Sequence, residues 1–198
     1  MAGMATPSTP TRERIISAAA KLFYREGIRA VSVDAVAEKA GVTKRTLYYH
    51  FKSKDDLIEA YLTGRDQPNL AIFKRWFTEA EAPLPEKIKG LFFNLAQSAR
   101  HPKWKGCGFL RTAAELANMP GHPAVKAGAA HKKRLEAWLA EEFAAAGLTD
   151  PLQLARQITL LLDGSFAIVL LNRDPSYMES AGEAAASLVE TALRPRLG

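Results

Sequence analysis

The chain has 198 residues, of which 47% are hydrophobic and 24% are charged, close to the average for a globular protein. This length fits one or two domains, and the composition excludes a mostly disordered chain, a collagen and a coiled-coil rod. The net charge is +6, and the whole excess lies in residues 1–54, which hold ten Lys or Arg and four Asp or Glu. A basic segment ahead of a neutral remainder indicates a polyanion-binding module joined to a domain with another role.

The residues present disfavour several kinds of site. The single cysteine, Cys107, excludes an intrachain disulfide and a Cys-rich zinc site, and the four histidines show no metal-binding spacing. We therefore expect no metal and no cofactor. Residues 1–10 lack the apolar core of a secretory signal, and the longest apolar stretch, residues 158–171, contains Asp163 and is short for a bilayer. These features favour a reduced, cytoplasmic protein that has no membrane partner.

The first quarter of the chain predicts three helices after a disordered tail over residues 1–10. Apolar periodicity and capping residues place these helices at about residues 11–26, 33–40 and 44–50. Gly41 stands where a left-handed residue lets the chain reverse, and Thr43 is placed to cap the third helix. Two short helices joined by a three-residue turn and braced by a preceding helix form the helix-turn-helix pattern.

The third helix has two different faces. Leu47 and Phe51 are four residues apart and are expected to face the core. The opposite face carries Lys44, Arg45, Tyr48 and Tyr49. A helix of this kind can bury one face on its own domain and insert the other into the major groove of DNA.

The rest of the chain is predicted to be almost wholly helical, which gives an all-α fold of about nine helices. The expected helices lie at about residues 54–80, 83–100, 109–118, 123–146, 151–172 and 176–193. Pro68 should kink or split the first of these, because proline removes a backbone donor. The last two helices, about residues 151–193, are apolar on more than one side, which predicts a four-helix bundle between two copies of the chain.

The string VSVDAVAEKAGVTKRTLYYHFKSKDDLIEAYL resembles the DNA-binding signature of the tetracycline-repressor (TetR) family of bacterial transcription regulators. The matching positions are Ser32-Val33, Ala37, Ala40-Gly41-Val42, Thr46-Leu47-Tyr48, His50-Phe51, Lys54 and Leu57. The resemblance covers about residues 10–62, and the remainder agrees only in length, helix number and helix order. It implies a homodimeric repressor that binds a palindromic operator in double-stranded DNA and is released by a small-molecule effector. Residues 11–53 would form the helix-turn-helix DNA-binding domain, and residues 54–198 the effector-binding and dimerisation domain.

Candidate DNA contacts follow from the motif and from the resemblance. They are Ser32, Thr43, Lys44, Arg45, Thr46, Tyr48, Tyr49, His50 and Lys54. Lys44 and Arg45 open the third helix, whose first residues meet base edges in this docking mode. By carry-over from the family, Tyr49, His50 and Lys54 are expected to contact backbone phosphate. Ser32 either only caps the second helix or also binds phosphate at that helix N-terminus.

Candidate effector-pocket residues lie further along the chain. They are Phe73, Trp76, Phe77, Phe92, Cys107, Phe109, Glu115, Asp163 and Phe166. The aromatic members either line a pocket or form ordinary core. Glu115 and Asp163 stand in otherwise apolar helices, so each either orients an effector or pairs with an arginine such as Arg111 or Arg134.

No catalytic arrangement is visible, since the sequence shows no nucleophile–base pair, phosphate-binding loop or metal spacing, and we do not expect an enzyme. Two alternatives to a repressor stay open. The chain could be a helical ligand-binding protein with an incidental basic segment. It could also bind nucleic acid without sequence preference.

Overall fold

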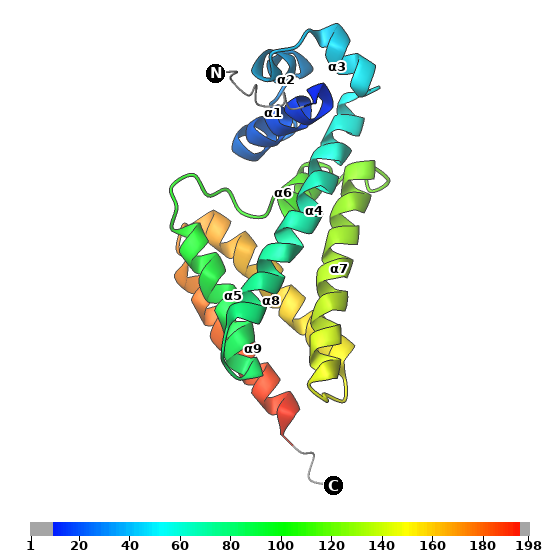
Figure 1. The fold of residues 1–198 in the computed structure, drawn as a ribbon. Helices are drawn as coiled ribbons and strands as arrows, with labels where there is room; N and C mark the ends of the chain where they lie inside the picture. The colour runs from blue at the N-terminus through cyan, green and yellow to red at the C-terminus, as the bar shows by residue number, and fades with distance from the viewer. Residues whose placement is uncertain (1–9, 195–198) are drawn as a thin grey trace, which may run out of the picture.

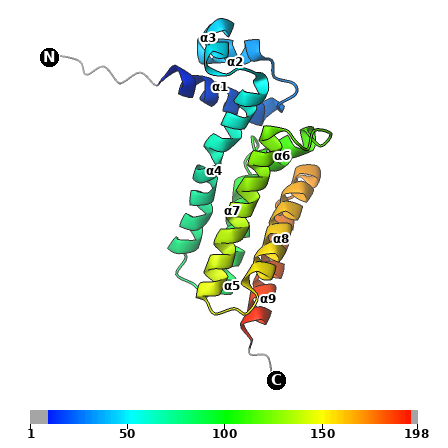
Figure 2. The same cartoon turned by 90° about the vertical axis from the view of Figure 1, so that its right-hand side faces the viewer.

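The computed structural model describes residues 10–194, and over that range the chain forms nine α-helices and no strand (Figures 1 and 2). They are α1 (Thr11–Glu26), α2 (Val33–Ala40), α3 (Lys44–His50), α4 (Lys54–Glu79), α5 (Leu84–Ala99), α6 (Gly108–Glu115), α7 (Pro123–Ala145), α8 (Pro151–Asn172) and α9 (Ser176–Leu193). The predicted all-α class and helix order are confirmed. The expectation of a disordered tail lies, for residues 1–9, outside the described part of the chain.

Two of the predicted helices differ in detail from the observed ones. Helix α6 ends at Glu115 rather than near Asn118, because the backbone tightens there: the N–H of Ala117 donates to the carbonyl of Ala114, three residues back. Helix α4 is not split, and it runs unbroken from Lys54 to Glu79 through Pro68. Proline lacks only one N–H, so α4 loses a single helical hydrogen bond at that position.

Side-chain oxygens cap α2, α3, α4 and α8, and the caps of α2 and α3 are the Ser32 and Thr43 that the sequence indicated. Ser32, Thr43 and Ser53 each accept a hydrogen bond from the backbone N–H three residues further on, at 3.1 Å in each case. Asp150 does the same for α8, at 3.3 Å. Such caps satisfy backbone donors that would otherwise lack a partner in the first turn.

The helices form a small head and a longer body. Helices α1–α3 make up the head at one end of the molecule, and α4 runs from the head down the body (Figures 1 and 2). In the body α5 packs on α9, α7 packs on α8 and on α4, and α8 packs on α9. Two clusters of buried residues result, one in the head and one in the body, and the head cluster also takes in Phe109 of α6 and Ala124 of α7.

Helix α8 is the most apolar of the nine helices described. It spans 22 residues and contains an 18-residue window of mean hydropathy 1.6, so its length and composition alone would allow it to cross a membrane. The helix is longer than the apolar stretch of residues 158–171 considered from the sequence. Its length therefore does not exclude a membrane-spanning role. The core helices of globular proteins pass the same criterion, and 39% of this window is buried within the body.

Candidate nucleic-acid interface and ligand cavity

The turn between α2 and α3 has the geometry that the sequence predicted. Gly41 ends α2 in the left-handed conformation, with φ 66° and ψ 40°, and its N–H donates to the carbonyl of Glu38 at 3.0 Å. Thr43 then caps α3. The chain reverses within three residues because glycine adopts this conformation without steric cost.

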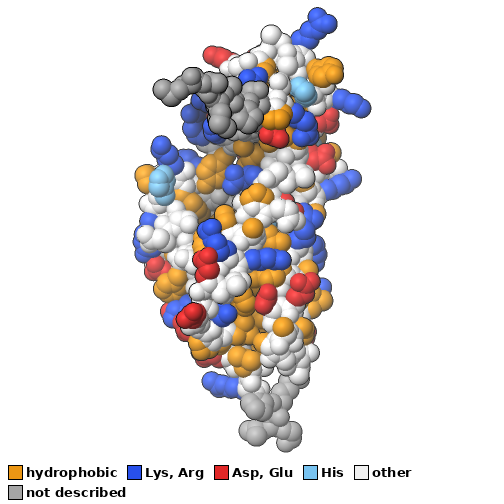
Figure 3. All heavy atoms as spheres, viewed as in Figure 1, with side chains coloured by type: hydrophobic (Ala, Val, Ile, Leu, Met, Phe, Trp, Pro, Cys, Tyr) orange, Lys and Arg blue, Asp and Glu red, His pale blue; other side chains and the backbone are white. Residues whose placement is uncertain are grey.

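Helix α3 presents the two faces expected of a recognition helix. Leu47 and Phe51 are buried in the head core, at 0% and 3% exposure. On the other side Tyr48 and Tyr49 are 43% and 86% exposed, and Lys44 and Arg45 are also exposed. In Figure 3 Lys and Arg side chains project from this end of the molecule. The predicted division between a core face and a solvent face is confirmed.

The cations of the head differ in their surroundings. The ammonium of Lys44 lies 3.0 Å from a carboxylate oxygen of Asp34, and this hydrogen bond raises the pKa of Lys44. Burial lowers the pKa of Lys54, which is partly covered at the start of α4. Among the described residues, no carboxylate pairs with Arg45. Arg45 is therefore the cation at the start of α3 that is free for a base or phosphate.

Other predicted DNA contacts make local interactions on the same surface. The hydroxyls of Thr46 and Thr43 are 2.9 Å apart, and the rings of Tyr49 and His50 meet edge to face with centroids 5.2 Å apart. Ser32 is exposed while its hydroxyl caps α2. The structure thus gathers all nine candidates at α2, α3 and the start of α4, and their contacts to DNA stay predictions.

Polar contacts link the head to the body around Tyr24, near the end of α1. The guanidinium of Arg111 donates to the backbone carbonyl of Tyr24 at 2.7 Å. The phenol oxygen of Tyr24 accepts the N–H of Lys105 at 2.9 Å. Beside it, the carboxylate of Glu115 accepts the N–H of Arg29 at 3.0 Å. The loop before α6, and α6 itself, are therefore hydrogen-bonded to the head.

A cavity of about 230 Å³ lies in the body beneath these contacts. Its lining comes from α1, α4, α5, the loop before α6, α6, α7 and α8. The apolar part of the wall includes Ile72, Phe73, Trp76, Trp104, Leu162 and Phe166, and the rings of Trp104 and Phe166 are nearly parallel, with centroids 6.3 Å apart. Tyr24 of the head also lines it.

The nine candidate effector residues separate into groups. Four of them line the cavity: Phe73, Trp76, Cys107 and Phe166. Three lie in the buried core and do not line it: Phe77, Phe92 and Phe109. Glu115 faces the head, and Asp163 pairs with Lys132. Neither carboxylate pairs with Arg111 or Arg134, the arginines considered from the sequence.

Several lining residues are not among the nine candidates. Among them are Arg65 and Asn69 of α4 and His131 and Lys132 of α7. The sequence does contain a signal for the two residues of α4. Arg65 and Asn69 lie at helical spacing after the buried Ile58 and Leu62, on the same side of the helix. Polar residues on an otherwise apolar stripe indicate either a buried pair or a ligand site.

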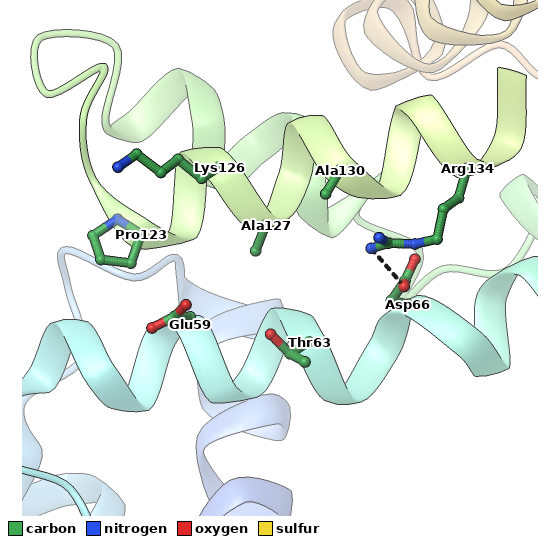
Figure 4. A pocket seen from close by; sticks show the side chains of 8 residues that line it. All are labelled: Glu59, Thr63, Asp66, Pro123, Lys126, Ala127, Ala130 and Arg134. Atoms are coloured by element: carbon green, nitrogen blue, oxygen red, sulfur yellow. Dashed lines mark ion pairs between the residues drawn. The ribbon is translucent and has the colours of Figure 1, made fainter. Parts of the chain in front are cut away.

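A polar cluster centred on the buried Asp66 joins α4 to α7. The Nδ1 of His131 lies 2.7 Å from Oδ1 of Asp66, and the guanidinium of Arg134 lies 2.6 Å from Oδ2 (Figure 4). Burial opposes ionisation of Asp66, but the hydrogen bonds from His131 and Arg134 outweigh it and lower the pKa of Asp66. Burial lowers the pKa of His131, so a neutral imidazole donates its Nδ1–H to the carboxylate. The ring of His131 stacks on Phe109, with centroids 3.9 Å apart.

A second hollow lies beside this cluster, between α4 and α7. It measures about 440 Å³ and is lined by small or charged side chains such as Thr63, Ala127 and Ala130, with the Asp66–Arg134 pair at one end (Figure 4). Asp66 and Arg134 pair with each other at its edge, whereas the aromatic cavity combines apolar walls with polar groups, as ligand sites commonly do. Within residues 10–194 no group of three His, Cys, Asp or Glu could hold a metal ion.

The fold and the exposed basic face of α3 define the class of protein, a helix-turn-helix DNA-binding protein with a helical body. The family model for bacterial regulatory proteins of the tetR family matches residues 15–61. A putative TetR-type regulator from Streptomyces avermitilis is 31% identical over 93% of this chain and 98% of its own, with a TM-score of 0.77. A TetR-family regulator from Streptomyces coelicolor is 30% identical over 93% of this chain and 96% of its own, with a TM-score of 0.76. The chain belongs to the TetR family of transcriptional regulators.

Curated relatives match over shorter stretches. The transcriptional repressor KstR2 of Mycolicibacterium smegmatis is 30% identical over 117 residues, which are 58% of this chain and 57% of that protein. The transcriptional regulator UidR of Escherichia coli is 36% identical over 93 residues, 47% of this chain and 42% of that protein. The chain thus matches about half the length of these relatives.

Proposed function

We propose that the chain is a homodimeric repressor that binds a palindromic operator and is released by a small-molecule effector. It would act in the cytoplasm, by binding DNA and effector rather than by catalysis. It would need no cofactor. The observation that carries the DNA-binding part is the arrangement of α3, with Leu47 and Phe51 buried and Arg45 and Tyr49 exposed on the opposite face. A match to a relative named as a repressor supports the direction of regulation.

The exposed apolar face of α8 and α9 supports the homodimer. Leu160 and Leu171 are 72% and 76% exposed, and Ile168 and Tyr177 are 38% and 45% exposed. Leu160, Ile168 and Tyr177 line a groove between the two helices, together with the small residues Gly164 and Ala181. Small residues allow close approach, so a second copy of the same face fits a symmetric four-helix contact. Two heads would then be presented to two operator half-sites.

The contacts of Tyr24 supply a connection between effector and operator. Its side chain lines the aromatic cavity, while its backbone and hydroxyl bind Arg111 and the loop before α6. An effector that binds better to an arrangement with displaced heads would lower the affinity for the operator. Bound operator would lower the affinity for the effector by the same factor.

Selection of bound duplexes from a random library, followed by sequencing, tests the proposal. A palindromic consensus is expected, together with a mass in solution of two chains. Random duplex bound as tightly as the selected one at moderate salt would favour the nonspecific binder instead. Arg75 is exposed on α4, far along the chain from α3, so Arg75→Ala serves as the control for Arg45→Ala.

A further inference from the structure

The aromatic cavity carries positive charge that its wall does not neutralise. Its lining includes Arg65 and Lys132 but no Asp or Glu. Lys132 is paired with Asp163. Among the described residues no carboxylate pairs with Arg65, and the buried Nε of its guanidinium has no hydrogen-bond partner. A buried donor without a partner is costly, so this position favours a ligand that supplies an acceptor.

Two tyrosine rings contact the guanidinium of Arg65 but give its Nε no hydrogen-bond acceptor. Its guanidinium carbon lies 5.6 Å from the ring centroid of Tyr24 and 5.9 Å from that of Tyr61. Burial raises the pKa of Tyr61, so this phenol stays protonated at neutral pH and supplies no negative charge. Cation–π contacts orient the guanidinium but leave its N–H groups available, and a planar fork of donors suits a carboxylate.

The size and the walls of the cavity restrict the rest of the ligand. An apolar cavity of about 150 Å³ holds a benzene ring, and this one measures about 230 Å³. It is smaller than the roughly 300–1,000 Å³ typical of sites for drug-sized ligands. Phe73, Trp76, Trp104 and Phe166 offer ring faces and edges to an aromatic group.

Resting on the effector role proposed above, we propose that this cavity binds a small aromatic carboxylate, one ring with a short acidic substituent, and that Arg65 is its counter-ion. The carboxylate pairs with the free donors of Arg65, and the ring lies among the apolar walls. The ligand then contacts Tyr24, the residue that links the cavity to α1. A cationic ligand is disfavoured, because among the described residues no carboxylate lines the cavity and Arg65 is an unpaired cation in its wall.

Pairs of probes that differ only in charge test the proposal on the intact chain. Benzoate, phenylacetate and salicylate are compared with the corresponding amides, by quenching of tryptophan fluorescence and by the shift of the unfolding temperature. Two of the three tryptophans, Trp76 and Trp104, line the cavity and would report occupancy. The carboxylates are expected to bind at least about tenfold more tightly than the amides, the ratio for one charge-assisted hydrogen bond.

Substitutions of Arg65 test whether this side chain causes the preference for carboxylates over amides. Arg65→Gln should bring the carboxylate down to the affinity of its amide, while Arg65→Lys should keep part of the difference. Arg75→Gln removes an exposed arginine from the same helix and should leave the preference intact. The probe comparison on the unaltered chain stands even if Arg65→Gln does not fold.

Three outcomes overturn the proposal: amides that bind as tightly as carboxylates, no probe that binds at millimolar concentration, or an Arg65→Gln variant that keeps the preference. None of these measurements uses DNA. A chain that selects a palindromic duplex yet shows any of these results keeps its proposed role as an operator-binding regulator and loses only the assignment of its ligand.

Discussion

Gly27, at the junction of head and body, allows a prediction with a matched control. It follows α1 with φ 91° and ψ 159°, a region that is essentially restricted to glycine. A Cβ added at this position would lie 2.9 Å from Oε1 of Glu115 and 3.1 Å from Oε2, and Oε2 accepts the N–H of Arg29. Gly41 also ends a helix with positive φ, but its φ 66° and ψ 40° are left-handed helical, and its added Cβ would meet nothing within 4 Å.

The magnitudes follow from these two environments. Gly27→Ala incurs backbone strain of about 1–3 kcal/mol and weakens an interaction of roughly 1 kcal/mol where Glu115 is displaced. Gly41→Ala incurs only the left-handed cost of about 1–2 kcal/mol. Both variants reduce the conformational entropy of the unfolded chain to the same extent, so this contribution cancels in the comparison. We expect Gly27→Ala to be less stable than Gly41→Ala by about 1–2 kcal/mol, or roughly 2–8 °C in unfolding temperature for a chain of this size.

Asparagine sharpens the contrast, because it tolerates the left-handed helical region but not the region that Gly27 occupies. Gly41→Asn should be nearly neutral, whereas Gly27→Asn should be as harmful as Gly27→Ala. Chemical unfolding followed by circular dichroism measures all four variants. If the two positions respond alike to alanine and to asparagine, the assigned backbone conformation of this junction is wrong.

Three other predictions concern DNA binding, assembly and pH. Arg45→Ala should relax base preference at one position per half-site, whereas Lys54→Ala should weaken all duplexes alike and reduce the salt slope by about 1, both read from binding titrations at several salt concentrations. Leu160→Glu places a charge on the exposed α8 face and should yield a chain that elutes as a monomer with its helix content retained; a dimer of unchanged mass would remove this face from the interface. Burial lowers the pKa of His131 below its ordinary 6.5, so on acidification the unfolded chain binds a proton more readily than the folded chain. The free energy of unfolding should therefore fall as the pH drops below 6.5. His131→Gln should reduce this pH dependence, measured by unfolding between about pH 7 and pH 5.

The parts of the structure that the sequence predicted well are those set by residues close together in the chain. Helix limits depend on periodicity and on caps such as Thr43 and Asp150, each of which acts within three residues. The two faces of α3 likewise depend on spacing within one helix, where Leu47 and Phe51 are four residues apart. Such features can be predicted from a few neighbouring residues without knowledge of the tertiary contacts.

The cavity was harder to predict, because its wall is assembled from residues far apart in the chain. Aromatic composition selected Phe73, Trp76 and Phe166, which line it, but also Phe77 and Phe92, which are core. Nothing local distinguishes a phenylalanine that faces a cavity from one that packs against another helix. That difference depends on how helices from separate parts of the chain cross.

Tyr24 shows why the connection between the two parts of the molecule was invisible in the sequence. It follows the buried Phe23 on a helix whose pattern explains only the packing of the head. Its ring nevertheless lines the cavity beside Arg65, and its hydroxyl holds the loop before α6. A ligand that draws Arg65 away from this ring changes a contact of α1 directly, and α1 packs against α2 and α3. One route from the cavity to the recognition helix therefore runs through α1, because Tyr24 belongs to the head and also lines the cavity.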